Sequence, residues 1–443
     1  MTAFVQKIRS WSRWINNVNA FQFFQLFRAG SAILISIILA KSSLGLADIA
    51  VYEWLLYIGL FVSFFWINAF LQALLPTFPQ LSTDLQRPFL ANVYLLFVGV
   101  SSFLALMLWL QPELWIRWLT GQNELPWFSW YILFIWLNLP TSLVEYIYLL
   151  NNRSRQVLLY GILSFGGYFV AVVGPILLGY GLGGAIRSIV LVGALRFIWL
   201  TYLVRPWQYT RWQATEIKNY IWLALPLIVY TFLAGAAQMF DNWLVGWYYE
   251  DKEPFAIFRY GARELPLATA LAGGLSAAMI PEVSKNVSTA LGIIRQKSLR
   301  IIHWLYPISI VLMLISPFLY PLVYSDAFSA SARIFNIYLL LLVSRVLLPY
   351  SILMGLKQTR AILFISVSEL LVNVILSLLL IGEWGLEGIA VATVVAFLFE
   401  KLLMITYIYY KYSFSPKTYI PIRCYLIYST LLIVAFFLSW QWT

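Results

Sequence analysis

The chain has 443 residues, of which 62% are hydrophobic and only 11% are charged, whereas soluble globular proteins carry about 25% charged residues. So few charges cannot cover the surface of a water-soluble protein of this length, and the mean hydropathy of +0.82 indicates an integral membrane protein. The single cysteine, Cys424, and the single histidine, His303, exclude an internal disulfide and a metal centre built on Cys or His. We therefore expect no metal and no cofactor.

Apolar stretches of about 20 residues recur along the whole chain, and each is long enough to cross a hydrocarbon core of ~30 Å. Ahead of the first stretch, the basic and aromatic residues of 1–21 predict an interfacial segment on the cytoplasmic face. Thirteen spans then follow, predicted at 22–40, 50–75, 90–110, 127–150, 157–178, 183–204, 219–246, 257–281, 299–324, 333–356, 361–382, 386–411 and 420–441.

The two halves of the chain resemble one another at an offset of about 205 residues. Arg155, before the fifth span, corresponds to Arg360 before the eleventh. Six spans per copy is an even number, so the two copies are predicted to be parallel six-helix repeats, an arrangement found in transporters that rock two bundles around a central site. The predicted domains are an N-lobe at 22–204, a cytoplasmic linker at 205–218, a C-lobe at 219–416 and an extra C-terminal span within 417–443.

The basic residues are distributed unevenly between the two sides of the membrane. With a cytoplasmic N-terminus, the cytoplasmic segments hold 18 of the 29 Lys and Arg residues and the opposite loops hold four. This split follows the positive-inside rule, so the net charge of +11 reflects topology. We therefore expect membrane lipids, and no nucleic acid, as partners.

Short motifs are spread over residues 20–415, at 25–30 (QLFRAG), 50–52 (AVY), 181–185 (GLGGA), 225–242 (from Leu225 and Pro226 to Asp241 and Asn242) and 385–388 (GLEG). Together they resemble the MOP superfamily, which includes MATE exporters and MurJ-type flippases of peptidoglycan precursors. Within it they are most similar to the Wzx-type flippases of polysaccharide and O-antigen synthesis.

The resemblance implies an all-α, two-lobed, V-shaped bundle in the bacterial cytoplasmic membrane. Such a protein would flip a polyprenyl-pyrophosphate-linked oligosaccharide to the outer leaflet by alternating access, alongside other polysaccharide-assembly proteins. It would be a transporter and not an enzyme. Relatives commonly have twelve or fourteen spans, so a thirteenth span is a departure from the family pattern.

Charged residues inside spans are costly and mark either a transport pathway or an ion pair. Depths estimated at ~1.5 Å per residue predict a structural pair between Arg28 and Glu145, and a second pair between Asp241 and Arg259 or Arg263.

Arg196 and Arg345 fall near the midplane, and no acidic partner is predicted at their depth. The guanidinium group fits phosphate oxygens. We expect a cavity that binds the anionic headgroup and is lined by arginines, namely Arg28, Arg263, Arg345, Arg196 and Arg259.

Polar residues also recur at helical spacing inside spans, as Glu369 and Asn373 do. Such faces serve either interhelical hydrogen bonding or the wall of a wet cavity, and the sequence leaves both open. Asp241 or Glu369 is the candidate to bind a coupling proton or Na⁺.

Two other functions fit parts of the sequence. A MATE-like antiporter for cationic drugs would favour an acidic cavity, whereas the intramembrane charges here are balanced. A membrane polysaccharide polymerase or ligase would be expected to carry a long outside loop with catalytic residues, yet the longest outside connection, near 111–126, is about sixteen residues. No catalytic residue is predicted.

Overall fold

The computed structural model describes residues 17–209 and 212–442, so most of the predicted interfacial segment 1–21 lies outside the described residues. Within those ranges all regular secondary structure is helical. Ten of the described helices are long and apolar enough to cross a membrane, or up to twelve crossings if each of two bent helix pairs is one span. The chain is therefore an all-α, multi-pass membrane protein, as the hydropathy predicted.

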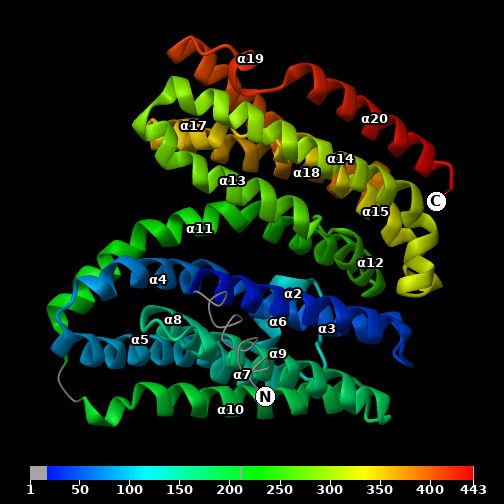
Figure 1. Cartoon of the computed structure of the whole chain (residues 1–443). Helices are drawn as coiled ribbons and strands as arrows, with labels where there is room; N and C mark the ends of the chain where they lie inside the picture. Colours follow the sequence, from blue (N-terminus) through cyan, green and yellow to red (C-terminus); the bar gives the residue numbers. More distant parts are fainter. Residues whose placement is uncertain (1–16, 210–211, 443) are drawn as a thin grey trace, which may run out of the picture. The chain divides into compact units, whose positions relative to one another are not determined.

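The chain divides into two compact units, residues 1–235 and 236–443. Unit 1 contains several membrane-length helices and a bent pair, α3 and α4, which meet at 46° (Figure 1). The predicted parallel relation between two six-helix repeats stays a prediction. The helices of unit 1 are α2 (Asn17–Lys41), α3 (Leu46–Phe61), α4 (Phe64–Thr77), α5 (Thr83–Leu110), α6 (Pro112–Thr120), α7 (Phe128–Asn138), α8 (Leu143–Leu150), α9 (Ser154–Leu177), α10 (Gly181–Val204) and the first part of α11 (Ala214–Tyr248).

Aromatic side chains fill the interior of unit 1. Phe24 of α2 is 2% exposed, stacks on Tyr160 and meets Phe165 edge to face, both on α9. Gly161 makes this contact possible, because a Cβ atom there would come within 2.9 Å of the Phe24 ring. Small residues at such crossings let membrane helices approach closely.

Unit 2 begins with the last part of α11 and contains three helices that open with proline, α13, α17 and α19, since proline is tolerated at a first turn, where no N–H is needed. The predicted C-terminal span 420–441 is present as α20, which packs along α14 (Figure 1). The α-helices of unit 2 that follow α11 are α12 (Glu253–Gly261), α13 (Pro266–Lys285), α14 (Val287–Val323), α15 (Ser329–Leu339), α16 (Leu342–Arg345), α17 (Pro349–Gly355), α18 (Thr359–Tyr412), α19 (Pro416–Tyr419) and α20 (Ile422–Trp440).

The longest helix, α18, is a helical hairpin. Its 54 residues would extend about 80 Å at ~1.5 Å per residue, more than twice the membrane core. Gly385 breaks it with φ of 58° and ψ of −135°, a conformation that favours glycine. The chain folds back there and brings Gly388 against Leu380. The approach is so close that a Cβ atom at Gly388 would lie only 2.4 Å from the carbonyl oxygen of Leu380. α18 therefore supplies the two predicted spans 361–382 and 386–411.

Two predicted spans are interrupted helices. Span 257–281 covers the end of α12, a non-helical stretch at 262–265 and most of α13. Proline disfavours helical conformation in the residue before it, and Pro266 begins α13 directly after this stretch. Span 333–356 is likewise divided among α15, α16 and α17. Hydropathy predicted both spans as continuous because apolar content does not register a local break.

Candidate functional site

Polar oxygen atoms gather around Asp241 in the interior of unit 2. Asp241 lies on α11 and is 1% exposed. Its Oδ2 accepts a hydrogen bond of 2.6 Å from the hydroxyl of Thr393 on the second arm of α18. The Thr393 hydroxyl in turn accepts a bond of 3.3 Å from the side-chain amide of Asn373, on the first arm. Three membrane segments thus converge on one carboxylate.

Several oxygen atoms in this cluster have no hydrogen-bond partner among the described residues, although they are buried. They are Oδ1 of Asp241, Oδ1 of Asn373 and Oγ of Ser377. Asn373 and Ser377 both lie close beside the Asp241 carboxylate. Leaving buried polar atoms unpaired is costly, and a proton, a water molecule or a cation would each satisfy these oxygens.

The donor set matches a hard cation, since such ions bind carboxylate, amide, hydroxyl and backbone carbonyl oxygens. The carbonyl oxygen of Ile389 accepts a hydrogen bond of 3.1 Å from the Thr393 hydroxyl and adds a backbone oxygen to the set of metal-binding atoms. One carboxylate among neutral oxygens favours a monovalent ion. The part of the chain that the structure describes holds no group of three or more His, Cys, Asp or Glu that would suit a more highly charged metal.

Glu369 lies one turn before Asn373 on α18 and is 8% exposed. Its Oε1 has no hydrogen-bond partner within the described residues. It lies within electrostatic range of Asp241 and of an adjacent ion pair, Glu400 with Lys401, whose charged atoms are 2.5 Å apart. Unit 2 therefore buries two carboxylates, Asp241 and Glu369, near each other, as the sequence singled out.

Arg345, predicted to be without an acidic partner, is paired. Its Nε and Nη2 donate to the two carboxylate oxygens of Glu264, at 2.9 and 2.5 Å, and its guanidinium lies 4.3 Å from the centre of the Phe397 ring. Glu264 belongs to the stretch between α12 and α13, and Arg345 ends α16. The depth comparison missed the pair because Glu264 sits at a helix break, where position along the chain does not report depth.

Arg196 of α10 also has partners, which corrects the second midplane prediction. Its Nη1 donates to Oδ1 of Asn138 at 2.8 Å, and its Nη2 donates to the carbonyl oxygen of Ser164 at 2.6 Å. The guanidinium lies 5.7 Å from the ring centres of Phe165 and Tyr168. Neutral acceptors and aromatic faces replace the carboxylate that the sequence analysis sought.

The predicted pairing of Arg28 with Glu145 is not a direct contact within the described residues. Glu145 is 8% exposed, and both Arg28 and Arg196 lie close enough to interact with it electrostatically. Arg28 itself is exposed on α2.

The predicted pairing of Asp241 with an arginine is not found either, because its carboxylate contacts Thr393. Arg263 instead donates through Nε to the carbonyl oxygen of Arg259 at 3.2 Å. Its guanidinium lies 4.8 Å from the centre of the Tyr260 ring. The five arginines are therefore divided, with Arg28 and Arg196 in unit 1 and Arg259, Arg263 and Arg345 in unit 2.

Sequence reasoning missed Thr393 and Ser377 as members of the Asp241 cluster. One signal was available for Ser377, which follows Asn373 by four residues and so extends the stripe that begins at Glu369. Thr393 gave no such signal, because it lies alone in an apolar segment and meets the others only through the hairpin of α18.

Comparison with solved structures identifies the fold. The chain is similar to the lipid II flippase MurJ in an inward closed conformation, with 16% identity and a TM-score of 0.66 over 96% of this chain and 97% of that one. It is also similar to an inward-facing multidrug resistance MATE family transporter of the MOP superfamily, with 13% identity and a TM-score of 0.59 over 86% and 94% of the two chains. It is similar as well to the Vibrio cholerae MATE transporter VcmN in its bent form, with 17% identity and a TM-score of 0.52 over 95% of this chain and 97% of that one.

The sequence itself matches no family model and no curated protein. At these low identities the structural likeness establishes the fold alone, which this chain shares with the flippase and the two MATE transporters.

Proposed function

From the fold that this chain shares with a lipid II flippase and with MATE transporters, we propose that it is a secondary transporter of a lipid-linked oligosaccharide, coupled to a monovalent cation at Asp241. The observation that carries the coupling is the cluster of buried oxygens without partners around that carboxylate. The oxygen donors would be Asp241, Asn373, Ser377, Thr393 and the Ile389 carbonyl.

Cation binding would act on conformation because its ligands come from separate segments. Asp241 belongs to α11, whereas Asn373 and Thr393 belong to the two arms of α18. A ligand shifts a conformational equilibrium only through its different affinity for the two states. A site assembled from three segments has that property, because any motion of α11 against α18 changes the number of oxygens in reach.

The substrate class follows from the basic residues of the spans. Arg28 is exposed on the apolar helix α2, and an intramembrane guanidinium requires water or an anionic ligand. A polyprenyl-pyrophosphate headgroup supplies phosphate oxygens that suit its fork. We assign contact with the headgroup to Arg28 in unit 1 and to Arg263 and its neighbour Arg259 in unit 2.

Arg345 and Arg196 have a different role in this proposal. Arg345 is held by Glu264, and Arg196 by Asn138 and Ser164. Either would have to exchange these protein partners for the headgroup, so we rank both behind Arg28, which is exposed on α2. The glycan would belong to O-antigen, capsule or exopolysaccharide synthesis, in concert with other assembly proteins in a bacterial cytoplasmic membrane.

The decisive experiment is flipping in proteoliposomes that contain the purified chain and a fluorescent polyprenyl-pyrophosphate oligosaccharide. Chemical quenching of the outer leaflet reports how much label has moved. We expect flipping that rises with an imposed Na⁺ gradient, falls in Asp241→Asn and falls in an Arg28→Ala, Arg263→Ala double variant. Arg117→Ala, in the short helix α6, is the matched control.

Three results would contradict the proposal. Flipping that ignores both the Na⁺ and the pH gradient would remove the coupling. Flipping that survives the double arginine replacement would remove the headgroup assignment. Uptake of a cationic dye in place of the labelled lipid would favour a MATE-like exporter, whose acidic site would then be Asp241 with Glu369.

A further inference from the structure

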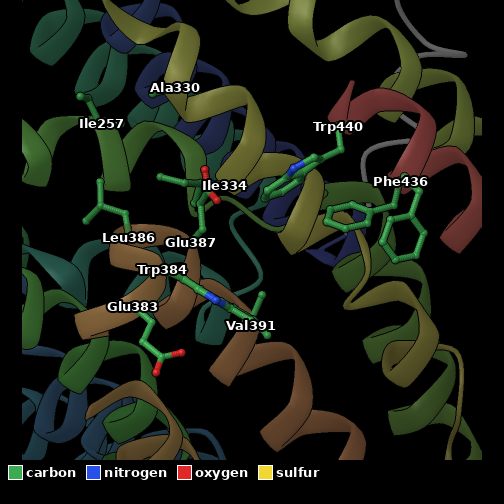
Figure 2. Close-up of a pocket in the computed structure, with 11 residues that line it drawn as sticks. Ile257, Ala330, Ile334, Glu383, Trp384, Leu386, Glu387, Val391, Phe436 and Trp440 are labelled. Atoms are coloured by element: carbon green, nitrogen blue, oxygen red, sulfur yellow. The ribbon is translucent and has the colours of Figure 1, made fainter. Parts of the chain in front are cut away.

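A pocket of about 620 Å³ lies in unit 2. Its walls come from α12, α15, the bend of α18 and the last turns of α20. Figure 2 shows Leu386, Glu387 and Val391 of the bend facing Ile334 of α15, with Phe436 and Trp440 of α20 on the other side. Most of the lining is apolar or aromatic, so the pocket suits hydrocarbon.

Charged groups stand at the same pocket. Glu383 and Glu387 both line it. Arg333 lies 3.6 Å from Glu387, which is longer than a hydrogen bond, and its guanidinium lies 5.3 Å from the centre of the Trp440 ring. The Nε of Arg333 has no hydrogen-bond partner among the described residues. Both the guanidinium and the Glu387 carboxylate therefore keep hydrogen-bonding capacity.

The position of the pocket along the helices places it at headgroup depth. Gly385 is the bend between the two arms of α18, and Trp440 ends α20, so both lie where membrane helices end. Trp384 and Trp440, which are 53% and 37% exposed, are of the residue type that gathers at the membrane–water interface. Apolar walls below charged groups at this depth match a lipid, with its chains in the pocket and its headgroup at the mouth.

We propose that this pocket is a binding site for a zwitterionic aminophospholipid, of the phosphatidylethanolamine class. The ammonium group would bind Glu387, with Glu383 as a second anionic group that points to the other side of the bend (Figure 2), and the phosphate would bind the guanidinium of Arg333. The acyl chains would lie against Leu386, Phe436 and the neighbouring apolar residues. No lining residue of this pocket belongs to the Asp241 cluster or to the proposed headgroup arginines, and the inference does not depend on what the chain transports.

Charge decides among the common headgroups. The mouth holds two carboxylates and one guanidinium, a net charge of −1, which disfavours an anionic headgroup such as phosphatidylglycerol. A zwitterion inserted between Arg333 and Glu387 would replace one long ion pair by two charge-assisted contacts of opposite sense. A primary ammonium donates up to three hydrogen bonds, whereas the quaternary ammonium of phosphatidylcholine donates none, so the carboxylates favour the primary amine.

Native mass spectrometry of the purified full chain, titrated with lipids of identical acyl chains, tests the proposal. The lipids are phosphatidylethanolamine, its N-methyl and N,N-dimethyl derivatives, phosphatidylcholine and phosphatidylglycerol. Affinity should fall at each added methyl group, and phosphatidylethanolamine should bind roughly tenfold tighter than phosphatidylcholine, because charge-assisted hydrogen bonds are lost. Phosphatidylglycerol should bind most weakly of the five.

A double variant, Glu383→Gln with Glu387→Gln, should bring phosphatidylethanolamine to within about threefold of phosphatidylcholine, since only the apolar contacts then remain. Glu282→Gln is the control, because Glu282 is half-exposed on α13 and pairs with Lys285. Equal binding of phosphatidylethanolamine and phosphatidylcholine, tightest binding of phosphatidylglycerol, or an unchanged preference in the double variant would each overturn the proposal. The methylation series uses the unaltered chain, so it decides the matter even if the double variant does not fold.

Discussion

The two units bury opposite charges in different ways. Unit 1 encloses the guanidinium of Arg196 between an amide oxygen, a backbone carbonyl and two aromatic rings. Unit 2 encloses the carboxylate of Asp241 among oxygens, where the Thr393 hydroxyl donates to it and Asn373 and Ser377 lie within reach. Two of the three guanidinium nitrogens have protein acceptors, with Nε unpaired among the described residues, whereas the carboxylate has one short hydrogen bond and an unpaired Oδ1.

This difference suggests two roles for buried charge. One charge holds the structure together, and the other binds and releases a positive partner. A buried charge that several protein groups hold is expected to stay in place through a conformational cycle. A buried carboxylate with few donors around it is neutralised either by a proton or by a bound cation. We therefore expect variants at Arg196 to change stability and variants at Asp241 to change cation response, and the predictions below follow this division.

The largest effect is expected at Asp241. Replacing it with Asn removes the only formal charge among the proposed cation ligands, which should weaken Na⁺ binding by about 4 kcal/mol, roughly a thousandfold. Thermal unfolding in detergent measures this, since a ligand that binds only the folded state raises its stability. Na⁺ should stabilise the original chain and leave Asp241→Asn unchanged.

The control for this variant is Asp326→Asn, at the start of a short helical turn (Asp326–Phe328) outside the cluster. It should respond to Na⁺ like the original chain. A Na⁺-induced shift in Asp241→Asn as large as in the control would place the cation elsewhere.

The next effect is expected at Arg196. Replacement with Met keeps the length of the side chain but removes the donor to the Asn138 amide oxygen and the second donor to the Ser164 carbonyl, which keeps its bond within α9. We expect a loss of about 3 kcal/mol in the free energy of unfolding, because the amide oxygen then stays unpaired. Na⁺ should stabilise this variant as much as the original chain, and a lost Na⁺ response would mean that the two units do not divide the roles.

A third, smaller effect is expected at the bend of α18, which brings Asn373 and Thr393 together beside Asp241. Gly388→Ala places a Cβ atom 2.4 Å from the backbone oxygen of Leu380 and should cost about 2 kcal/mol of stability through overpacking. Gly382→Ala is the matched control in the same helix, because no atom lies within 4 Å of its Cβ position. Equal melting temperatures for the two variants would show that the arms are not packed as closely as described.

The smallest effect is expected at Thr393. Valine has the same shape but lacks the hydroxyl that donates to Asp241 and accepts from Asn373. Na⁺ affinity should fall by roughly tenfold while the carboxylate remains. Isothermal titration with Na⁺ measures this, and an unchanged affinity would exclude Thr393 from the ligand set.

Features that depend on local composition were predictable from the sequence. The thirteen predicted spans all have helical counterparts, including both arms of α18, because apolar length is a local property. The choice of Asp241 and Glu369 among the acidic residues also followed from their position inside apolar segments. The breaks before Pro266 and after Arg345 were missed, because their flanks are as apolar as continuous helix.

Partners across the fold were not predictable in the same way. Glu264 is 81 residues from Arg345, and depth counted along one helix says nothing of a residue at a break in another. The search for partners of Arg196 considered only carboxylates, whereas a guanidinium is equally satisfied by an amide oxygen and a backbone carbonyl. Thr393 joined the cluster through a turn whose geometry depends on one glycine.

The bend at Gly385 also restricts how this gene can vary. Asn373 and Thr393 stand on opposite arms of α18, and each residue turns an α-helix by about 100°. Inserting or deleting a single residue between them would rotate one arm's side chains away from Asp241, whereas exchanging the exposed residues of the bend would leave the facing atoms in register. Natural variants of this hairpin are therefore expected to differ in the composition of the segment 382–387 and to agree in its length.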